Sequence, residues 1–232
     1  MPGFWPLSRK AESYVTTPMP GPHGKYACIP LKVILRDVLK LSQTSKEAVS
    51  ILNSGKVLVD KKVRKETRFP VGLMDVLEIP ELHARYRMSI TKAGLGLEKL
   101  SEEETGFKLC KIVGKTTMKG GKNQISLHDG RTILTKEPYR IGDSIVIEIP
   151  GQKVLKHFSL KKGEPAFIIA GRNTGVRGRI KDIKERKNML EKSTIIIEGD
   201  GKDIQTLKDY VMVGSLHEES EEAPKKKKSD KA

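Results

Sequence analysis

The chain has 232 residues, of which 37% are hydrophobic and 31% are charged, and its formal net charge is +15 at pH 7. This length allows one to three domains with small cores, and the positive charge favours a polyanionic partner, with nucleic acid ahead of an anionic membrane. No apolar run approaches the ~20 residues of a membrane span and no signal peptide opens the chain, so we expect a cytoplasmic protein without a membrane partner.

Metal binding and catalysis are not indicated by the residues that usually carry them. Cys28 and Cys110 lie far apart without a CxxC pair, and the five histidines are scattered without the spacing of metal ligands. We therefore expect no metal, no cofactor, no small-molecule substrate and no catalytic residue.

Residues 1–30 contain six prolines, which exclude long helices or strands. This predicts an extended arm, which either stays free or orders against RNA by stacking aromatic rings and pairing cations with phosphates. The candidate contacts in the arm are Trp5, Arg9, Lys10 and His23.

Residues 31–41 carry apolar side chains at helical spacing, while Lys32, Arg36 and Lys40 fall at i, i+4 and i+8 on the opposite face. A second helix is predicted to open at Thr44, with Glu47 completing a capping box. One helical face would then enter a core and the other would face a polyanion.

Next in the chain, apolar residues alternate with polar ones around a turn near residues 60–61, which predicts a half-buried β-hairpin. A single lysine here would also fit an ordinary solvated surface, but helix face and hairpin together form one compact cationic unit suited to phosphates. The cations of the hairpin segment are Lys56, Lys61, Lys62, Arg64, Lys65 and Arg68.

From residue 107 the pattern becomes β, with FKLCKIV, then NQISLHDGRTILTK with Asp129–Gly130 at its turn, then SIVIEIP, and these short strands suggest a small barrel. Lys115, Lys119 and Lys122 surround a flexible hairpin tip that either contacts phosphates or keeps a turn soluble, and we add Arg131 to the candidates. The GKTT sequence is not a phosphate-binding P-loop, because the first glycine of that motif is replaced by Leu109.

A third β block follows, with a turn predicted at residues 200–201. Between its first strands lies GRNTGVRGRI, whose glycines permit close backbone approach. Its candidate contacts are Arg172, Asn173, Arg177 and Arg179, and the alternative is an ordinary glycine-rich turn. Residues 218–232 hold five acidic and five basic side chains, so the whole positive excess belongs to the rest of the chain.

The order of these parts resembles a known family. Residues 31–79 resemble the S-four-type RNA-binding domain, and GRNTGVRGRIKDI resembles a KOW motif. Together with FWPLSRK, GKVLVDKKVR, FPVGLMDVLEIPE and FKLCKIVGKTTMKGGKNQISLHDGR, they resemble the e-type small-subunit ribosomal protein four of archaea and eukaryotes over residues 4–214. Only three residues precede the FWP segment, where this family usually has a longer basic arm, which puts extra N-terminal RNA contacts in doubt.

The resemblance implies a structural constituent of the small ribosomal subunit, without catalytic activity, whose partners are ribosomal RNA and neighbouring ribosomal proteins. It implies an α+β, multidomain fold, and the mixed-charge end favours an archaeal source. The expected parts are an extended arm at 1–30, an S-four-type domain at 31–90, a central SH3-like β domain at 91–160, a KOW domain at 161–215 and a charged, disordered tail at 216–232. An RNA-binding regulatory factor and an RNA-modifying enzyme anchored by an S-four-type domain are the alternatives.

Overall fold

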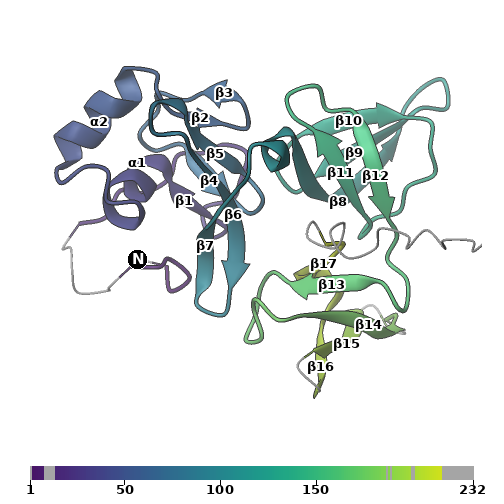
Figure 1. Cartoon of the computed structure of the whole chain (residues 1–232). Helices are drawn as coiled ribbons and strands as arrows, with labels where there is room; N and C mark the ends of the chain where they lie inside the picture. The colour runs from purple at the N-terminus through teal and green to yellow at the C-terminus, as the bar shows by residue number, and fades with distance from the viewer. Residues whose placement is uncertain (1, 8–13, 187, 189, 200–201, 216–232) are drawn as a thin grey trace, which may run out of the picture.

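The computed structural model describes residues 2–7, 14–186, 188, 190–199 and 202–215. Strands dominate this part of the chain, and they form one two-stranded and three five-stranded antiparallel sheets. Figure 1 shows both helices on one side of the molecule, away from strands β8 to β17. The mixed, strand-rich class with several sheets is therefore confirmed.

The first predicted helix is present in a modified form. Helix α1 (Leu31–Val33) passes directly into a π-helical segment (Ile34–Val38), and Leu39 N–H donates to Ile34 O at 2.8 Å. A π turn takes one residue more per hydrogen bond than an α turn, and Lys40 already lies beyond the helix with φ +54°. The expected straight row of Lys32, Arg36 and Lys40 is therefore broken.

Helix α2 (Ser45–Asn53) begins where the capping box predicted. Thr44 Oγ1 accepts from Glu47 N–H at 3.3 Å, and the Glu47 carboxylate accepts from Thr44 N–H at 3.4 Å. The two groups satisfy N–H donors that a helix start leaves open. Ala48 and Leu52 face the interior and anchor the helix.

The first five-stranded sheet follows these helices in the order β3-β2-β5-β6-β7, and β1 pairs separately with β4. The predicted hairpin is confirmed, because β2 and β3 pair as antiparallel strands. Both residues of the turn between them, Asp60 and Lys61, adopt positive φ, as tight hairpin turns require. Strand β7 pairs with β6 along its length, so this sheet extends past residue 90. The bounds are β1 (Cys28–Pro30), β2 (Leu58–Val59), β3 (Lys62–Val63), β4 (Pro70–Gly72), β5 (Val76–Ile79), β6 (Ala84–Thr91) and β7 (Gly94–Lys99).

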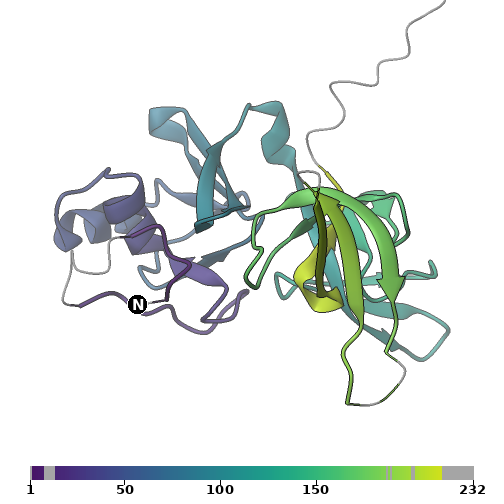
Figure 2. The same cartoon turned by 90° about the horizontal axis from the view of Figure 1, so that it is seen from below.

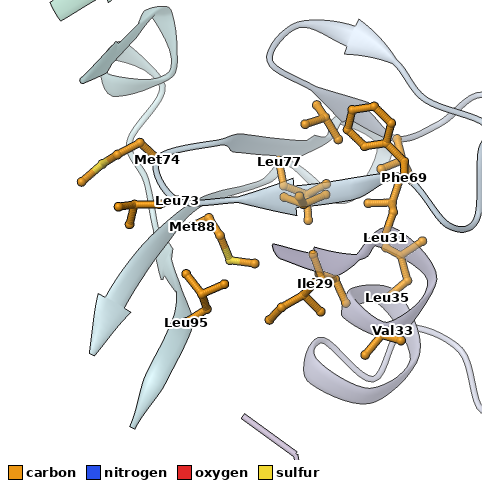
Figure 3. Close-up of a cluster of buried hydrophobic side chains, with 14 of the residues drawn as sticks. Ile29, Leu31, Val33, Leu35, Phe69, Leu73, Met74, Leu77, Met88 and Leu95 are labelled. Atoms are coloured by element: carbon orange, nitrogen blue, oxygen red, sulfur yellow. The ribbon is translucent and has the colours of Figure 1, made fainter. Parts of the chain in front are cut away.

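The helices and these strands share one apolar core. Figure 3 shows side chains from β1 and the first helix facing those of β5, β6 and β7. This cluster also contains Leu109, Val146 and Phe167, so it continues into the two sheets that follow. Its labelled members in the figure are Ile29, Leu31, Val33, Leu35, Phe69, Leu73, Met74, Leu77, Met88 and Leu95.

The start of the chain also belongs to this core. Trp5 is only 5% exposed, and its Nε1–H donates to Cys28 O at 3.0 Å. Leu95 N–H donates to Phe4 O at 3.1 Å, which fixes the segment along β7. The structure corrects the expectation that Trp5 stacks on RNA, since burial of its large apolar surface takes the ring out of reach.

The second five-stranded sheet has the order β10-β9-β8-β11-β12 and encloses its own small core, which includes Cys110, Ile125 and Ile145. The predicted turn at Asp129–Gly130 joins β9 to β10, with Gly130 at φ +75°. The bounds are β8 (Phe107–Thr117), β9 (Asn123–Leu127), β10 (Thr132–Thr135), β11 (Ser144–Glu148) and β12 (Val154–Phe158).

The third five-stranded sheet has the order β16-β15-β14-β13-β17, with a core that includes Ile168, Ile180 and Ile195. Figures 1 and 2 show it, in green to yellow, beside the second sheet. The predicted turn at residues 200–201 lies outside the described residues. The bounds are β13 (Pro165–Ile168), β14 (Arg177–Lys184), β15 (Thr194–Gly199), β16 (Lys202–Leu207) and β17 (Val211–Val213).

Candidate nucleic-acid interface

The cations of the first helical segment are partly neutralised. Arg36 donates to the carboxylate of Asp37 at 2.7 and 3.0 Å and to Ser45 Oγ at 3.0 Å, which ties it to the start of α2. Lys32 is half-buried, whereas Lys40 is exposed. Of these three predicted contacts, Lys40 presents the most accessible charge.

The β2–β3 hairpin divides its cations into two groups. Lys61 is half-buried and paired within the protein, with Nζ donating to Glu78 and to Thr105, both at 2.9 Å. Lys62 and Lys65 are exposed. Arg64 is half-buried with its guanidinium 4.4 Å from the centre of the Phe69 ring. The open face of the hairpin therefore presents Lys62 and Lys65 to a partner.

Two flanking cations of this segment are also paired. Lys56 Nζ lies 2.8 Å from a carboxylate oxygen of Glu81, with both side chains about half exposed. Arg68 donates to Thr17 O at 2.9 Å and to Thr17 Oγ1 at 3.1 Å, so it fastens the arm to the hairpin unit. An exposed pair of this kind is weak and leaves both residues able to exchange partners with a phosphate.

A buried ionic cluster joins the first sheet to the second. Lys108 of β8 is completely buried, and its Nζ lies 3.0 Å from Asp60 and 3.1 Å from Asp129 and also contacts Asp75. Arg131 Nη2 donates to Asp60 at 2.6 Å. The predicted contact Arg131 is therefore committed to carboxylates of the protein.

The arm supplies a histidine to the same cluster. His23 is 5% exposed, and its Nε2 lies 2.9 Å from a carboxylate oxygen of Asp75. Burial alone would raise the pKa of Asp75, but Lys108 and His23 hold that pKa below its ordinary value. The structure corrects the expectation that His23 contacts RNA, because its ring is used to bind the arm to the first sheet.

Little in the sequence indicates that Lys108 is buried. Burial opposes its charge, but Asp75 and Asp60 raise the pKa of Lys108 above its ordinary value, so it remains an ammonium ion. Only the apolar neighbours in FKLCKIV hint that this lysine enters a core. Together with exposed Lys62, the cluster surrounds a cavity of about 390 Å³.

The β8–β9 tip extends into solvent. Gly120 and Gly121 have positive φ and no atom within 4 Å of an added Cβ. Lys119 and Lys122 flank them and are exposed, whereas Lys115 Nζ donates to Tyr139 O at 3.1 Å. Two of the three predicted cations of this tip are thus free to approach a phosphate.

The glycine-rich loop between β13 and β14 contacts the protein with one side and solvent with the other. A Cβ at Gly175, where φ is +83°, would lie 2.5 Å from the carbonyl carbon of Thr91. Arg172 and Asn173 are exposed at the loop, and Arg177 and Arg179 are exposed on β14. The glycine therefore permits close packing on the β6–β7 turn, while the arginines remain accessible.

The two remaining candidates, Arg9 and Lys10, lie outside the described residues. Among the described residues, no group of three or more metal-ligating side chains comes together. None of the helices in the described part of the chain is long and apolar enough to cross a membrane. Apart from Lys40, the exposed candidates lie in three sequence regions, around residues 56–68, 119–122 and 172–179.

Comparison with known proteins gives a consistent result. Residues 82–154 match the family model described as ribosomal family S4e. The chain is 43% identical over 213 residues to small ribosomal subunit protein eS4 of Methanothermobacter thermautotrophicus, covering 91% of this chain and 88% of the relative. It is 41% identical over 212 residues to the protein of the same name from Archaeoglobus fulgidus, covering 91% and 89%.

A solved structure has a similar fold. The crystal structure of the 30S ribosomal protein S4e from Thermoplasma acidophilum superposes with a TM-score of 0.70 at 33% identity. The match covers 82% of this chain and 96% of the other.

Proposed function

Because this chain belongs to the eS4 family of small ribosomal subunit proteins, we propose that it is a structural constituent of the small subunit and binds ribosomal RNA there. Family membership is the observation that carries this proposal. The charge distribution agrees with it, since the whole excess of +15 lies outside residues 218–232.

The proposed interface consists of exposed side chains at Lys40 and in three further regions of the folded chain, around residues 56–68, 119–122 and 172–179. Phosphate contacts from these side chains would supply most of the affinity, and RNA shape and unpaired bases would supply specificity. The residues proposed to lead these contacts are Lys40, Lys62, Lys65, Lys119, Lys122, Arg172, Asn173, Arg177 and Arg179. Lys32, Arg36, Lys56 and Arg68 are proposed as secondary contacts that first exchange a partner or become more exposed.

We also propose that the fold consists of three structural modules. The segment 31–99 would form the S-four-type unit, the second sheet an SH3-like barrel, and the third sheet a KOW domain. Support comes from the separate core inside each of the last two sheets and from GRNTGVRGRIKDI, which runs from the β13–β14 loop into β14. Neighbouring ribosomal proteins would cover part of the remaining surface.

Salt dependence of binding tests the RNA-binding part of the proposal. The logarithm of the association constant of the full chain for a small-subunit ribosomal RNA transcript should fall linearly with log[KCl], with a slope of about −0.9 per duplex phosphate contact and about −0.7 per single-stranded contact. The double variant Lys62→Ala/Lys65→Ala should bind more weakly and with a shallower slope.

A matched double variant controls for the loss of two charges. Lys162 and Lys181 are not among the proposed contacts, and both are exposed, with Nζ 2.6 Å from Asp182 and 2.5 Å from Asp203, respectively. Lys162→Ala/Lys181→Ala should therefore leave affinity and slope nearly unchanged. A salt-independent affinity of the unmodified chain would contradict the proposal.

A further inference from the structure

A cavity of about 330 Å³ lies between the first and third five-stranded sheets. Its apolar lining includes Met74, Ile90, Leu109 and Phe167. Strands β6, β7, β13 and β14 all contribute to it, so it exists only because the two sheets are packed together. Its size and apolar walls with a few polar groups are typical of sites for small organic groups.

Arg87 gives this cavity an unusual chemical character. The side chain is 1% exposed, and only its Nη2 has a hydrogen-bond acceptor, Glu104 O at 2.8 Å. Its Nε and Nη1 have no hydrogen-bond partner among the described residues. Buried donors without acceptors are costly, so these two nitrogens call for an explanation.

Ser89 shows the same feature two residues further along β6. It lines the cavity, is 3% exposed, and its hydroxyl has no hydrogen-bond partner in the described part of the chain. Arg87 and Ser89 lie on the same face of β6, while Met88 between them joins the apolar core. One face of the strand thus contributes to the cavity wall two side chains that hold unused polar atoms.

Two further arginines line the cavity from β14. Arg177 and Arg179 are exposed, and their spacing places both on one face of the strand. Arg177 Nη2 lies 3.3 Å from Glu98 of β7 across the junction, with both side chains substantially exposed. With Arg87, Arg177 and Arg179 against Glu98, the charged side chains of the lining are positive on balance.

Apolar walls, buried hydrogen-bond donors and accessible cations together match the parts of a nucleotide. A phosphate alone would make no use of the apolar walls, and an apolar side chain would leave the donors of Arg87 unsatisfied. Sequence-specific RNA recognition commonly uses unpaired bases that leave the stack, pack on side chains and form hydrogen bonds through their edges.

We propose that this cavity receives the base of one unpaired nucleotide of ribosomal RNA, with Arg87 and Ser89 donating to the base and with Arg177 and Arg179 binding the adjoining phosphates. This inference rests on the proposed function and assigns one of the RNA contacts to the cavity between the first and third sheets. It also gives the RNA a way to hold the first and third sheets in one fixed arrangement.

The test uses the full chain and a small-subunit ribosomal RNA transcript that contains 4-thiouridine and 6-thioguanosine. Irradiation followed by mass spectrometry should find crosslinks on β6 and β13, near Ile90 and Phe167. Arg87→Met should weaken binding by about tenfold, a loss in keeping with removal of a hydrogen bond from a charged donor. Arg85→Met is the matched control, because Arg85 lies on the same strand, does not line the cavity and bridges Glu102 at 2.8 Å.

Crosslinks absent from β6 and β13, together with equal binding by Arg87→Met and Arg85→Met, would overturn the inference while leaving RNA binding intact. Failure of the unmodified chain to bind the transcript would instead overturn the proposed function. If Arg87→Met does not fold, the crosslinks on the unmodified chain decide. Binding that rises on deletion of residues 216–232 without cavity crosslinks would assign the cavity to that segment of the chain itself, since Ser215 lines the cavity, and would also overturn the inference.

Discussion

Lys108 Nζ lies 3.0 Å from the carboxylate of Asp60, although the two residues belong to different sheets and are separated by 48 positions in the chain. Asp75 and Asp129 complete the surroundings of this ammonium group. Removing the charge of one partner from such a cluster leaves the others buried and uncompensated.

Lys108→Met is therefore expected to lower the free energy of unfolding by about 3–5 kcal/mol, the usual cost of breaking a buried ion pair. Urea denaturation followed by circular dichroism measures the change. Lys119→Met, at an exposed position, is the control and should have little effect. A loss below 1 kcal/mol for Lys108→Met would show that the cluster does not stabilise the fold.

His128 makes the stability of the fold dependent on pH. Its Nδ1 accepts from Lys111 N–H at 3.2 Å and its Nε2 lies 3.2 Å from Leu73 O, an arrangement that uses both nitrogens of a neutral ring. Burial, followed by the charge of Lys108, lowers the pKa of His128 to about 4. The unfolded chain therefore binds more protons between about pH 6.5 and about pH 4.

Stability should accordingly fall by up to about 3 kcal/mol as the pH decreases through that window. Urea unfolding midpoints at several pH values measure this, and His128→Gln should flatten the dependence. His83→Asn is the control, because His83 is exposed and asparagine tolerates its positive φ. An identical pH profile for His128→Gln and the unmodified chain would refute the assignment.

Gly175 provides a test of the contact between the β13–β14 loop and the β6–β7 turn. Gly175→Ala adds a Cβ that would lie 2.5 Å from the Thr91 carbonyl carbon, so the loop must move. Gly163 has a similar φ, +87° against +83°, but open space around an added Cβ. Gly163→Ala should cost about 1 kcal/mol from its backbone conformation alone, and Gly175→Ala should cost clearly more. Equal decreases in the free energy of unfolding, measured with urea, would show that the packing contact does not stabilise the fold.

Trp5 is the only tryptophan, which makes its burial directly measurable. Its emission should be blue-shifted, poorly quenched by acrylamide and unchanged when ribosomal RNA is added. Trp5→Ala should lower the free energy of unfolding by about 3–5 kcal/mol through loss of core packing. A shift of the emission maximum on adding RNA would show that Trp5 belongs to the RNA interface.

Local patterns in the sequence predicted local structure well. The capping box of Thr44 and Glu47 and the turn at residues 60–61 depend on neighbouring residues, and both are confirmed. The continuation of α1 as a π-helix was not predicted, because apolar spacing alone does not distinguish the two helix types.

Burial of polar residues could not be predicted in the same way. Lys108, His23 and Arg131 resemble surface residues until Asp60, Asp75 and Asp129 are brought beside them from other parts of the chain. Arg87 was missed as a candidate for the same reason, since its position between two sheets depends on how those sheets pack. Long-range packing therefore decides which cations remain available to RNA.

Crosslinking mass spectrometry on intact small subunits shows whether exposed cations on folded elements of this chain contact ribosomal RNA. We expect crosslinks to RNA at Lys62 and Lys65, at Lys119 and Lys122, and at residues 172–179. Crosslinks confined to Lys225, Lys226, Lys227 and Lys228, with none in those three regions, would contradict this expectation.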